Sequence, residues 1–243
     1  MGGFSIGTDT IELYNSLAPH YREYSRTRSA YLEAVEKYII HHIPHNATSL
    51  LDVGAGDGVR GMNIAIEKKI PRVVLSEPSM EMVARCRQLQ GAEVWSVSAE
   101  DLPVDRGTFD VVICLWNVLG HIESRVQRVE ALRRMEGLLS AEGVLFVDVN
   151  NRHNAAQYGT LKILGRIVKD FLLPDEKRGD ATFEWNVGNT KMISMGHLFT
   201  PREIEGLFIA SGLKVRQRVT ANYQDGTISK SVLKGQLLYT LTK

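Results

Sequence analysis

The chain has 243 residues, 44% of them hydrophobic, and its 29 basic and 28 acidic residues leave a net charge of +1. This size and apolar content suit one α/β domain with a cap, and the scattered, balanced charges argue against a DNA-binding surface. The two cysteines lack a metal-ligand spacing, the N-terminus lacks a signal sequence, and no apolar run could cross a membrane. We therefore expect a cytoplasmic protein with no metal site and no membrane partner.

We expect four regions along the chain. Helical and strand patterns identify three of them, and the fourth is where these patterns stop. Residues 1–45 are expected to form a helical lid with a break at Pro19. Residues 46–150 alternate apolar strands with helical patterns, which is typical of a doubly wound parallel sheet. The predicted strands are 49–53, 72–76, 93–97, 109–115 and 143–149, and the predicted helices between them are 58–69, 79–89 and 122–139.

The alternation stops after residue 150. Residues 151–200 hold an amphipathic stretch over 161–173, a polar turn and an irregular part around Trp185, and we expect them to form a substrate cap. Residues 201–243 restore the alternation with a helix over 201–211 and two strands, 213–220 and 235–242. Without a helix between them, these two strands must form a hairpin. The sequence thus predicts one α/β domain around a seven-stranded, mostly parallel sheet whose last strand is antiparallel.

A glycine turn follows the first strand. Gly54, Gly56 and Gly58 let the backbone adopt positive φ and approach a ligand, while the next helix directs free N–H groups at the same place. The dinucleotide fingerprint has a third glycine where this chain has Val59, so a NAD(P)-dependent reductase is only an alternative. Together with Asp52, the turn resembles motif I of the class I S-adenosylmethionine-dependent methyltransferases.

Two further segments extend this resemblance over most of residues 10–150. Glu77 ends the second strand about 20 residues beyond the glycines, where acids bind ribose hydroxyls. The segment 98–103 is similar to the family's "GDAEDLPF", which contacts adenine, although Ser98 replaces its Asp. Met82 could contact the adenine or pack in the core, and Glu100 could instead be a solvated turn residue.

The N-terminal segment 14–21 resembles the family's "YDxxAxxYD" motif. This resemblance implies that Tyr21 lies over the cofactor and that Arg26 or Arg28 meets its methionine carboxylate. The sequence does not choose between the two arginines. The full set of expected S-adenosylmethionine ligands is Tyr21, Arg26, Asp52, Gly54, Ala55, Gly56, Gly58, Glu77, Pro78, Met82, Ser98, Ala99, Glu100, Leu115 and Trp116.

The segments around the fourth and fifth strands indicate the acceptor. Residues 115–121 lack the Asn/Asp-Pro-Pro-aromatic motif of base-modifying enzymes and instead resemble "CLGNSFAHL" of glycine N-methyltransferases. Residues 145–151 resemble their "LLVIDHRNYD". Asn117 matches the substrate-binding asparagine of that family, but Asn150 occupies the place of its substrate-binding arginine, and Arg152 lies nearby. We therefore expect a small polar acceptor rather than glycine itself, bound by Asn117, His121, Asn150 and Arg152.

His121 could act as a general base, because an imidazole can take a proton from a hydroxyl or ammonium acceptor. It could equally cap or pack against the following helix. We predict methyl transfer from S-adenosylmethionine to a nitrogen or oxygen atom, with His121, Asn117 and Tyr21 as catalytic residues and S-adenosylhomocysteine as product. An RNA-modifying methyltransferase and a cofactor-binding protein without catalysis are the alternatives, although no RNA partner is expected, and a homodimer is left open.

Overall fold

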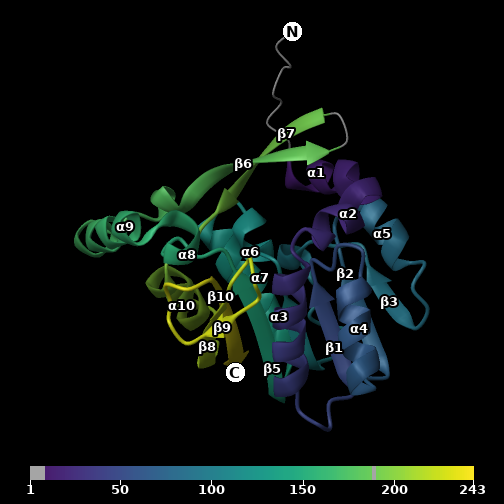
Figure 1. Cartoon of the computed structure of the whole chain (residues 1–243). Helices are drawn as coiled ribbons and strands as arrows, with labels where there is room; N and C mark the ends of the chain where they lie inside the picture. The colour runs from purple at the N-terminus through teal and green to yellow at the C-terminus, as the bar shows by residue number, and fades with distance from the viewer. Residues whose placement is uncertain (1–8, 188–189) are drawn as a thin grey trace.

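An eight-stranded sheet forms the centre of the computed structural model, which describes residues 9–187 and 190–243 (Figure 1). The strand order is β3-β2-β1-β4-β5-β10-β8-β9. The bounds are β1 (Ser49–Val53), β2 (Arg72–Ser76), β3 (Ala92–Trp95), β4 (Phe109–Cys114), β5 (Leu139–Val149), β8 (Lys214–Ala221), β9 (Ile228–Ser229) and β10 (Gln236–Thr242). Strands β1 to β5 are parallel, and β10 runs antiparallel to both β5 and β8. The predicted mixed sheet is confirmed, with the two-residue β9 as an addition.

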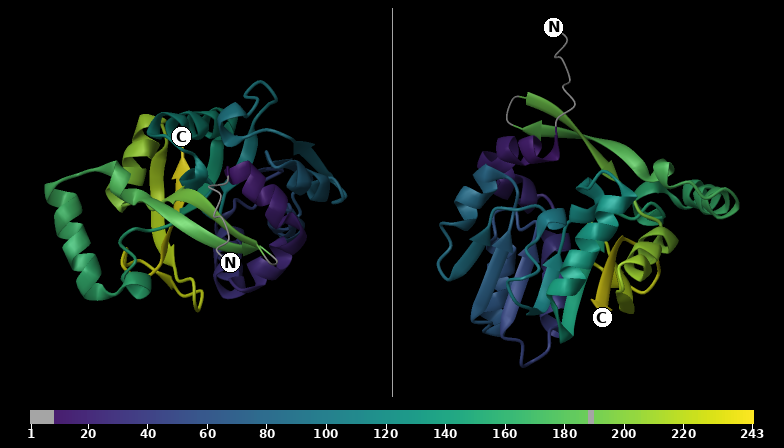
Figure 2. Two further views of the ribbon diagram at one scale, coloured as in Figure 1. Left: turned by 90° about the horizontal axis from the view of Figure 1, so that it is seen from above. Right: turned by 180° about the vertical axis from the view of Figure 1, so that it is seen from behind.

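Helices cover both faces of this sheet. Helices α3 (Ser29–His42), α4 (Val59–Lys68) and α5 (Met80–Cys86) lie on one face, and α7 (Arg125–Leu138) and α10 (Pro201–Ala210) lie on the other (Figures 1 and 2). Successive strand residues point to opposite faces. In β4, Val111 and Ile113 join the core under α3 and α4, whereas Val112 and Cys114 join the core under α7 and α10. Burial on both faces explains why residues 111–114 of β4 are continuously apolar.

Two predicted boundaries around the fourth and fifth strands were wrong. The chain first forms the short helix α6 (Val118–His121), and α7 begins only at Arg125, because the Ser124 side chain accepts a hydrogen bond from the Gln127 N–H and caps α7. Strand β5 begins at Leu139, four residues before its predicted start, and pairs there with Phe109 before a register shift. The N-terminal helices are α1 (Thr10–Leu17), η1 (Ala18–His20) and α2 (Tyr21–Arg26), followed by α3.

The predicted cap contains a second sheet in place of the irregular part. After α8 (Ala155–Tyr158), α9 (Thr160–Leu172) and η3 (Glu176–Gly179), strands β6 (Asp180–Val187) and β7 (Thr190–His197) form an antiparallel hairpin. Polar and apolar residues alternate from Thr182 to Val187, which is the strand pattern that the sequence prediction overlooked. The hairpin lies above α1, and α9 projects from the side of the molecule (Figures 1 and 2). In the part of the chain described, every helix is too short or too polar to span a bilayer.

Candidate active site

The glycine turn lies at the carboxyl end of β1, next to the end of β2. The N–H groups of Gly54 and Ala55 donate to the carbonyl oxygen of Ser76, which ties the turn to β2. At Gly56, φ is +58°, and a Cβ atom would lie 2.6 Å from the Tyr21 hydroxyl oxygen. Only glycine therefore fits beneath Tyr21 without strain.

Glu77 is buried at the same edge and holds the turn. Its Oε2 accepts a hydrogen bond of 2.8 Å from the Gly56 N–H, and its Oε1 accepts one of 2.9 Å from the Ser79 N–H. Burial raises the pKa of Glu77 to about 7, although both hydrogen bonds act to lower it. A carboxylate that is partly protonated near neutral pH therefore faces the cavity at this edge.

Most of the predicted cofactor residues surround one cavity of about 760 Å³, the larger cavity. Ten of them line it: Tyr21, Gly54, Gly56, Glu77, Pro78, Ser98, Ala99, Glu100, Leu115 and Trp116. They come from α2, the carboxyl ends of β1, β2 and β4, and η2 (Ala99–Asp101) after β3. A ligand at the carboxyl ends of parallel strands is the usual arrangement in doubly wound sheets.

The remaining cofactor predictions fall elsewhere. Met82 is fully buried in α5 and does not line the larger cavity. At Gly58, a Cβ atom would meet Leu75 and Cys86, so this glycine lets the turn pack closely on β2 and α5. The residues Arg26, Asp52 and Ala55 line a neighbouring cavity of about 310 Å³, the loop cavity, which shares Tyr21, Gly54, Leu115 and Trp116 with the larger one. Burial raises the pKa of Asp52 to about 7.

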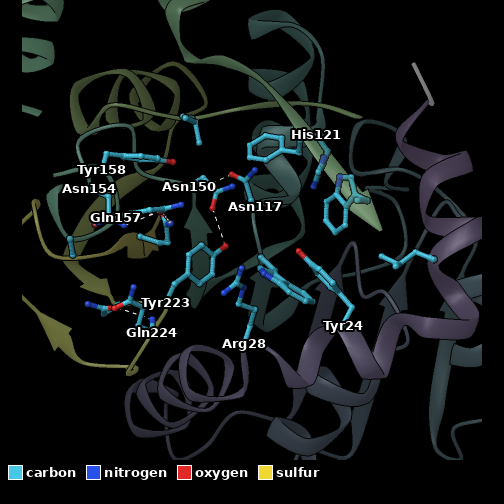
Figure 3. Close-up of a pocket in the computed structure, with 18 of the residues that line it drawn as sticks. Tyr24, Arg28, Asn117, His121, Asn150, Asn154, Gln157, Tyr158, Tyr223 and Gln224 are labelled. Atoms are coloured by element: carbon cyan, nitrogen blue, oxygen red, sulfur yellow. Dashed lines mark hydrogen bonds between the residues drawn. The ribbon is translucent and has the colours of Figure 1, made fainter. Parts of the chain in front are cut away.

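A further cavity of about 360 Å³, the amide cavity, adjoins the larger one (Figure 3). The two cavities share Tyr14, Tyr21, Trp116 and His121. Seven amide side chains line the amide cavity: Asn117, Asn150, Asn154, Gln157, Asn222, Gln224 and Gln236. Tyrosine, tryptophan and phenylalanine rings form much of the rest of its wall.

Of the four predicted substrate residues, three line the amide cavity: Asn117, His121 and Asn150. Arg152 does not. Its guanidinium instead binds both carboxylate oxygens of Asp170, at 2.8 and 3.2 Å. This ion pair is nearly buried and holds α9 against the chain after β5, so the side chain of Arg152 has a structural partner outside the cavity.

Trp116 and Asn117 form the wall between the cavities in a strained backbone conformation. Their φ angles are +63° and +65°, in the left-handed region that residues with a Cβ rarely adopt. One carboxylate oxygen of Asp148 accepts hydrogen bonds from both of their N–H groups, and the other accepts one of 2.5 Å from the Tyr31 hydroxyl. Asp148 is 1% exposed, so these bonds form away from water. The buried carboxylate thus holds the wall in place.

The side chain of Asn117 is fixed as well. Its Oδ1 accepts a hydrogen bond of 2.9 Å from the Asn150 N–H, and Asn150 Oδ1 accepts one of 3.1 Å from the Tyr223 hydroxyl (Figure 3). Any side chain at position 120 would collide with that of Asn117, so Gly120 leaves the room it occupies. Asn117 lines the amide cavity in this fixed position.

His121 lies between the two cavities and is uncharged at neutral pH. Burial lowers its pKa to about 4. Its Nε2 is 3.4 Å from the Tyr14 hydroxyl oxygen, and its Nδ1 is shielded from solvent with no hydrogen-bond partner in the described structure. Burial raises the pKa of Tyr14 well above its ordinary value, so the phenol stays protonated. A backbone hydrogen bond at Met195 acts to raise the pKa, but burial outweighs it, so a neutral imidazole lines both cavities.

The lining residues that the sequence analysis missed include members of three segments. Asn154 caps α8, which contributes Gln157 and Tyr158, while Phe183 and Trp185 come from β6, and Asn222, Tyr223 and Gln224 come from the turn after β8. The run of amide and aromatic residues at 222–224 was the available signal, because such residues in a turn often contact ligands. Among the described residues, no group of three or more His, Cys, Asp or Glu could hold a metal ion.

Comparison with known proteins identifies the domain. A family model described as a methyltransferase domain matches residues 50–143, and no curated protein matches the chain. Similar solved structures include a possible histamine N-methyltransferase from Thermotoga maritima, with 17% identity, a TM-score of 0.66 and coverage of 96% of this chain and 99% of that one. CalS10 with bound S-adenosylmethionine, an amino pentose methyltransferase from Micromonospora echinaspora, has 18% identity, a TM-score of 0.63 and coverages of 90% and 95%.

The sugar N-methyltransferase KedS8 from Streptoalloteichus has 17% identity, a TM-score of 0.61 and coverages of 100% and 96%. At such identities the likeness is one of fold, and the predicted similarity to glycine N-methyltransferases stays a prediction. The domain match covers the glycine turn and the strand ends that form the larger cavity, and the fold agrees over nearly the whole chain. Residues 50–143 therefore match a methyltransferase domain, and the chain as a whole has the fold of S-adenosylmethionine-dependent methyltransferases.

Proposed function

We propose that the enzyme methylates a nitrogen or oxygen atom of a small polar molecule held in the amide cavity. The observation that carries this proposal is the junction of the two cavities at Tyr14, Tyr21, Trp116 and His121. A volume of about 360 Å³ lies in the range of sites for small ligands. Amide side chains both donate and accept hydrogen bonds, so they suit an acceptor with several hydroxyl or amino groups.

The residues around the larger and loop cavities suit S-adenosylmethionine. Glu77 can accept hydrogen bonds from ribose hydroxyls, and Ala99 and Glu100 can contact the adenine. Gly54 and Gly56 leave space for the methionine part, which would extend towards the loop cavity. Arg26 lines that cavity, whereas Arg28 lines the amide cavity, which favours Arg26 as the partner of the methionine carboxylate.

When bound, S-adenosylmethionine would supply a sulfonium methyl group: the acceptor's lone pair forms a bond to the methyl carbon while the carbon–sulfur bond breaks, and S-adenosylhomocysteine is the leaving group. The main task of the protein is to align the acceptor with that methyl group, which contributes strongly to such a reaction. The amide of Asn117 can orient the acceptor, and Tyr21 lines both cavities where they meet. His121, unprotonated at neutral pH, can accept the proton that an ammonium or hydroxyl acceptor loses.

A transfer assay with the purified enzyme tests this proposal. S-adenosylmethionine is incubated with panels of amino sugars, amino acids, biogenic amines and phenols. The readouts are formation of S-adenosylhomocysteine and gain of one methyl group by the acceptor. We expect turnover with at least one small acceptor, and a clear loss of kcat in His121→Gln compared with the exposed control His45→Gln.

Two other outcomes would contradict the proposal. Methylation of tRNA alone, weakening steeply with salt, would instead indicate an RNA-modifying enzyme. Tight binding of S-adenosylhomocysteine without transfer to any acceptor would indicate a cofactor-binding protein that does not catalyse methyl transfer.

A further inference from the structure

We infer that the acceptor carries a negatively charged group, a carboxylate or a phosphate, and that Arg28 binds it. This inference rests on the proposed function, because it concerns the ligand of the amide cavity. It begins from the charges of the cavity wall. Arg28 is the one lining residue with a permanent charge, and no Asp or Glu among the described residues lines the cavity.

The arginine has no acidic partner within the described part of the chain. Two other arginines near the site are neutralised, since Arg22 pairs with Asp57 at 3.1 Å and Arg152 pairs with Asp170. No carboxylate lies within 4.0 Å of the Arg28 guanidinium in the described structure. Its charge is therefore available to a ligand.

Aromatic side chains direct Arg28 towards the cavity. Its guanidinium carbon lies 5.5 Å from the centre of the Tyr223 ring. Tyr24 stacks on Trp116 with an interplanar angle of 24°. Figure 3 shows Arg28 between Tyr223 and Tyr24, pointing towards Asn117 and Asn150. A guanidinium held over an aromatic face keeps its fork of N–H donors free for a planar carboxylate or a phosphate.

The positions of Arg28 and His121 give the acceptor a direction. The atom that receives the methyl group must lie near Tyr14, Tyr21, Trp116 and His121, where the amide cavity meets the larger cavity. In Figure 3, Arg28 and His121 lie on different sides of the cavity, with Asn117 on the same side as His121. We infer a bifunctional acceptor, with an amino or hydroxyl group at one end and an anion at the other. A polyamine would instead bring a second cation to Arg28.

Matched pairs of acceptors test this inference by calorimetry on the S-adenosylhomocysteine-loaded enzyme and by methyl transfer. The pairs are glucosamine with glucosamine 6-phosphate, glucosamine with its 6-carboxylate analogue, and glycinamide with glycine. We expect the acidic member of at least one pair to bind roughly tenfold more tightly, since charged hydrogen bonds are strong but Arg28 is exposed on one side. Comparing the phosphate pair with the two carboxylate pairs shows which of the two anionic groups the site prefers.

Variants identify the residue responsible. Arg28→Gln should remove the preference for the acidic member, Arg28→Lys should restore part of it, and the exposed control Arg87→Gln should retain it. Equal or better binding of the neutral members in every pair, no binding of any acidic member, or an unchanged preference in Arg28→Gln would overturn the inference.

The same experiment separates the inference from the proposed function. Methyl transfer to neutral acceptors without an acidic preference would leave the proposed function in place and overturn the inference. Binding of an acidic member that depends on Arg28, without methyl transfer to any acceptor, would support the anion site and overturn the proposed function.

Discussion

Replacing His121 by glutamine should change how the stability of the protein depends on pH. An exposed imidazole has a pKa of 6.5, but burial lowers that of His121 to about 4. Between these values the unfolded chain binds a proton that the folded protein does not, so the free energy of unfolding falls as the pH falls from 6.5 towards 4. The two pKa values correspond to at most about 3 kcal/mol, and we expect about 2 because the side chain is partly exposed.

Urea unfolding followed by tryptophan fluorescence measures this effect in the wild type, His121→Gln and His45→Gln. The comparison is made between about pH 7.5 and about pH 4.5, a range that covers most of the window between the two pKa values. Asp52 and Glu77 also titrate in this range, but their raised pKa values act in the opposite direction and cancel in the difference between variants. We expect His121→Gln to gain about 2 kcal/mol relative to the wild type on going to low pH.

The control His45→Gln should follow the wild type, because His45 is exposed. A constant difference between His121→Gln and the wild type at every pH would refute the reasoning. It would mean that the imidazole is as well solvated in the folded protein as in the unfolded chain. His121 would then be protonated near pH 6.5, and the argument for a neutral base at the junction of the two cavities would lose its basis.

Three further predictions concern the edge of the sheet. Burial raises the pKa of Glu77 to about 7, so the carboxylate that accepts the ribose hydrogen bonds becomes protonated as the pH falls below about 7. Calorimetry should show that S-adenosylhomocysteine binds more weakly at the lower pH, and that Glu77→Gln loses this pH dependence. An identical pH profile in the variant would contradict the role of Glu77. Asp148→Ala leaves three donors without an acceptor and should lower the free energy of unfolding by about 3–5 kcal/mol. Tyr31→Phe removes only one of these hydrogen bonds and should lower it by about 1 kcal/mol. Equal losses for the two variants in urea titrations would contradict the role of this network. Gly56→Ala should weaken cofactor binding at least roughly tenfold and leave the circular dichroism spectrum unchanged. Adding Tyr21→Phe should restore part of the affinity, because it removes the hydroxyl that the new methyl group meets. Full affinity in Gly56→Ala would show that this contact does not limit cofactor binding.

The sheet was predictable because its strands carry strong local signals. Continuous apolar runs mark strands buried on both faces, and two strands without a helix between them must form a hairpin. The hairpin β6–β7 was missed because the prediction overlooked the alternation of polar and apolar residues from Thr182 to Val187. The start of α7 was missed because Ser124 caps it three residues after α6 ends.

The site was predictable where its residues follow a strand directly. Glu77 and the glycines lie at fixed distances from β2 and β1, so local spacing places them. The role of Asp148 could not be predicted in this way, because it binds the backbone N–H groups of Trp116 and Asn117. These two residues adopt a left-handed conformation that their residue types do not predict. The sequence also could not show which of Arg26 and Arg28 lies near the cofactor. Their side chains line different cavities because the chain turns at Thr27.

The hairpin β6–β7 is continuous in sequence, and in the described structure its strands pair with each other and with no strand of the main sheet. It nevertheless contributes Phe183 and Trp185 to the amide cavity, and Ile193 and Met195 to the larger one. Its residues can therefore change without disturbing the register of any strand that carries the glycine turn. We therefore expect that grafting a different hairpin in place of residues 180–197 would change the lining of both cavities and leave the main sheet intact.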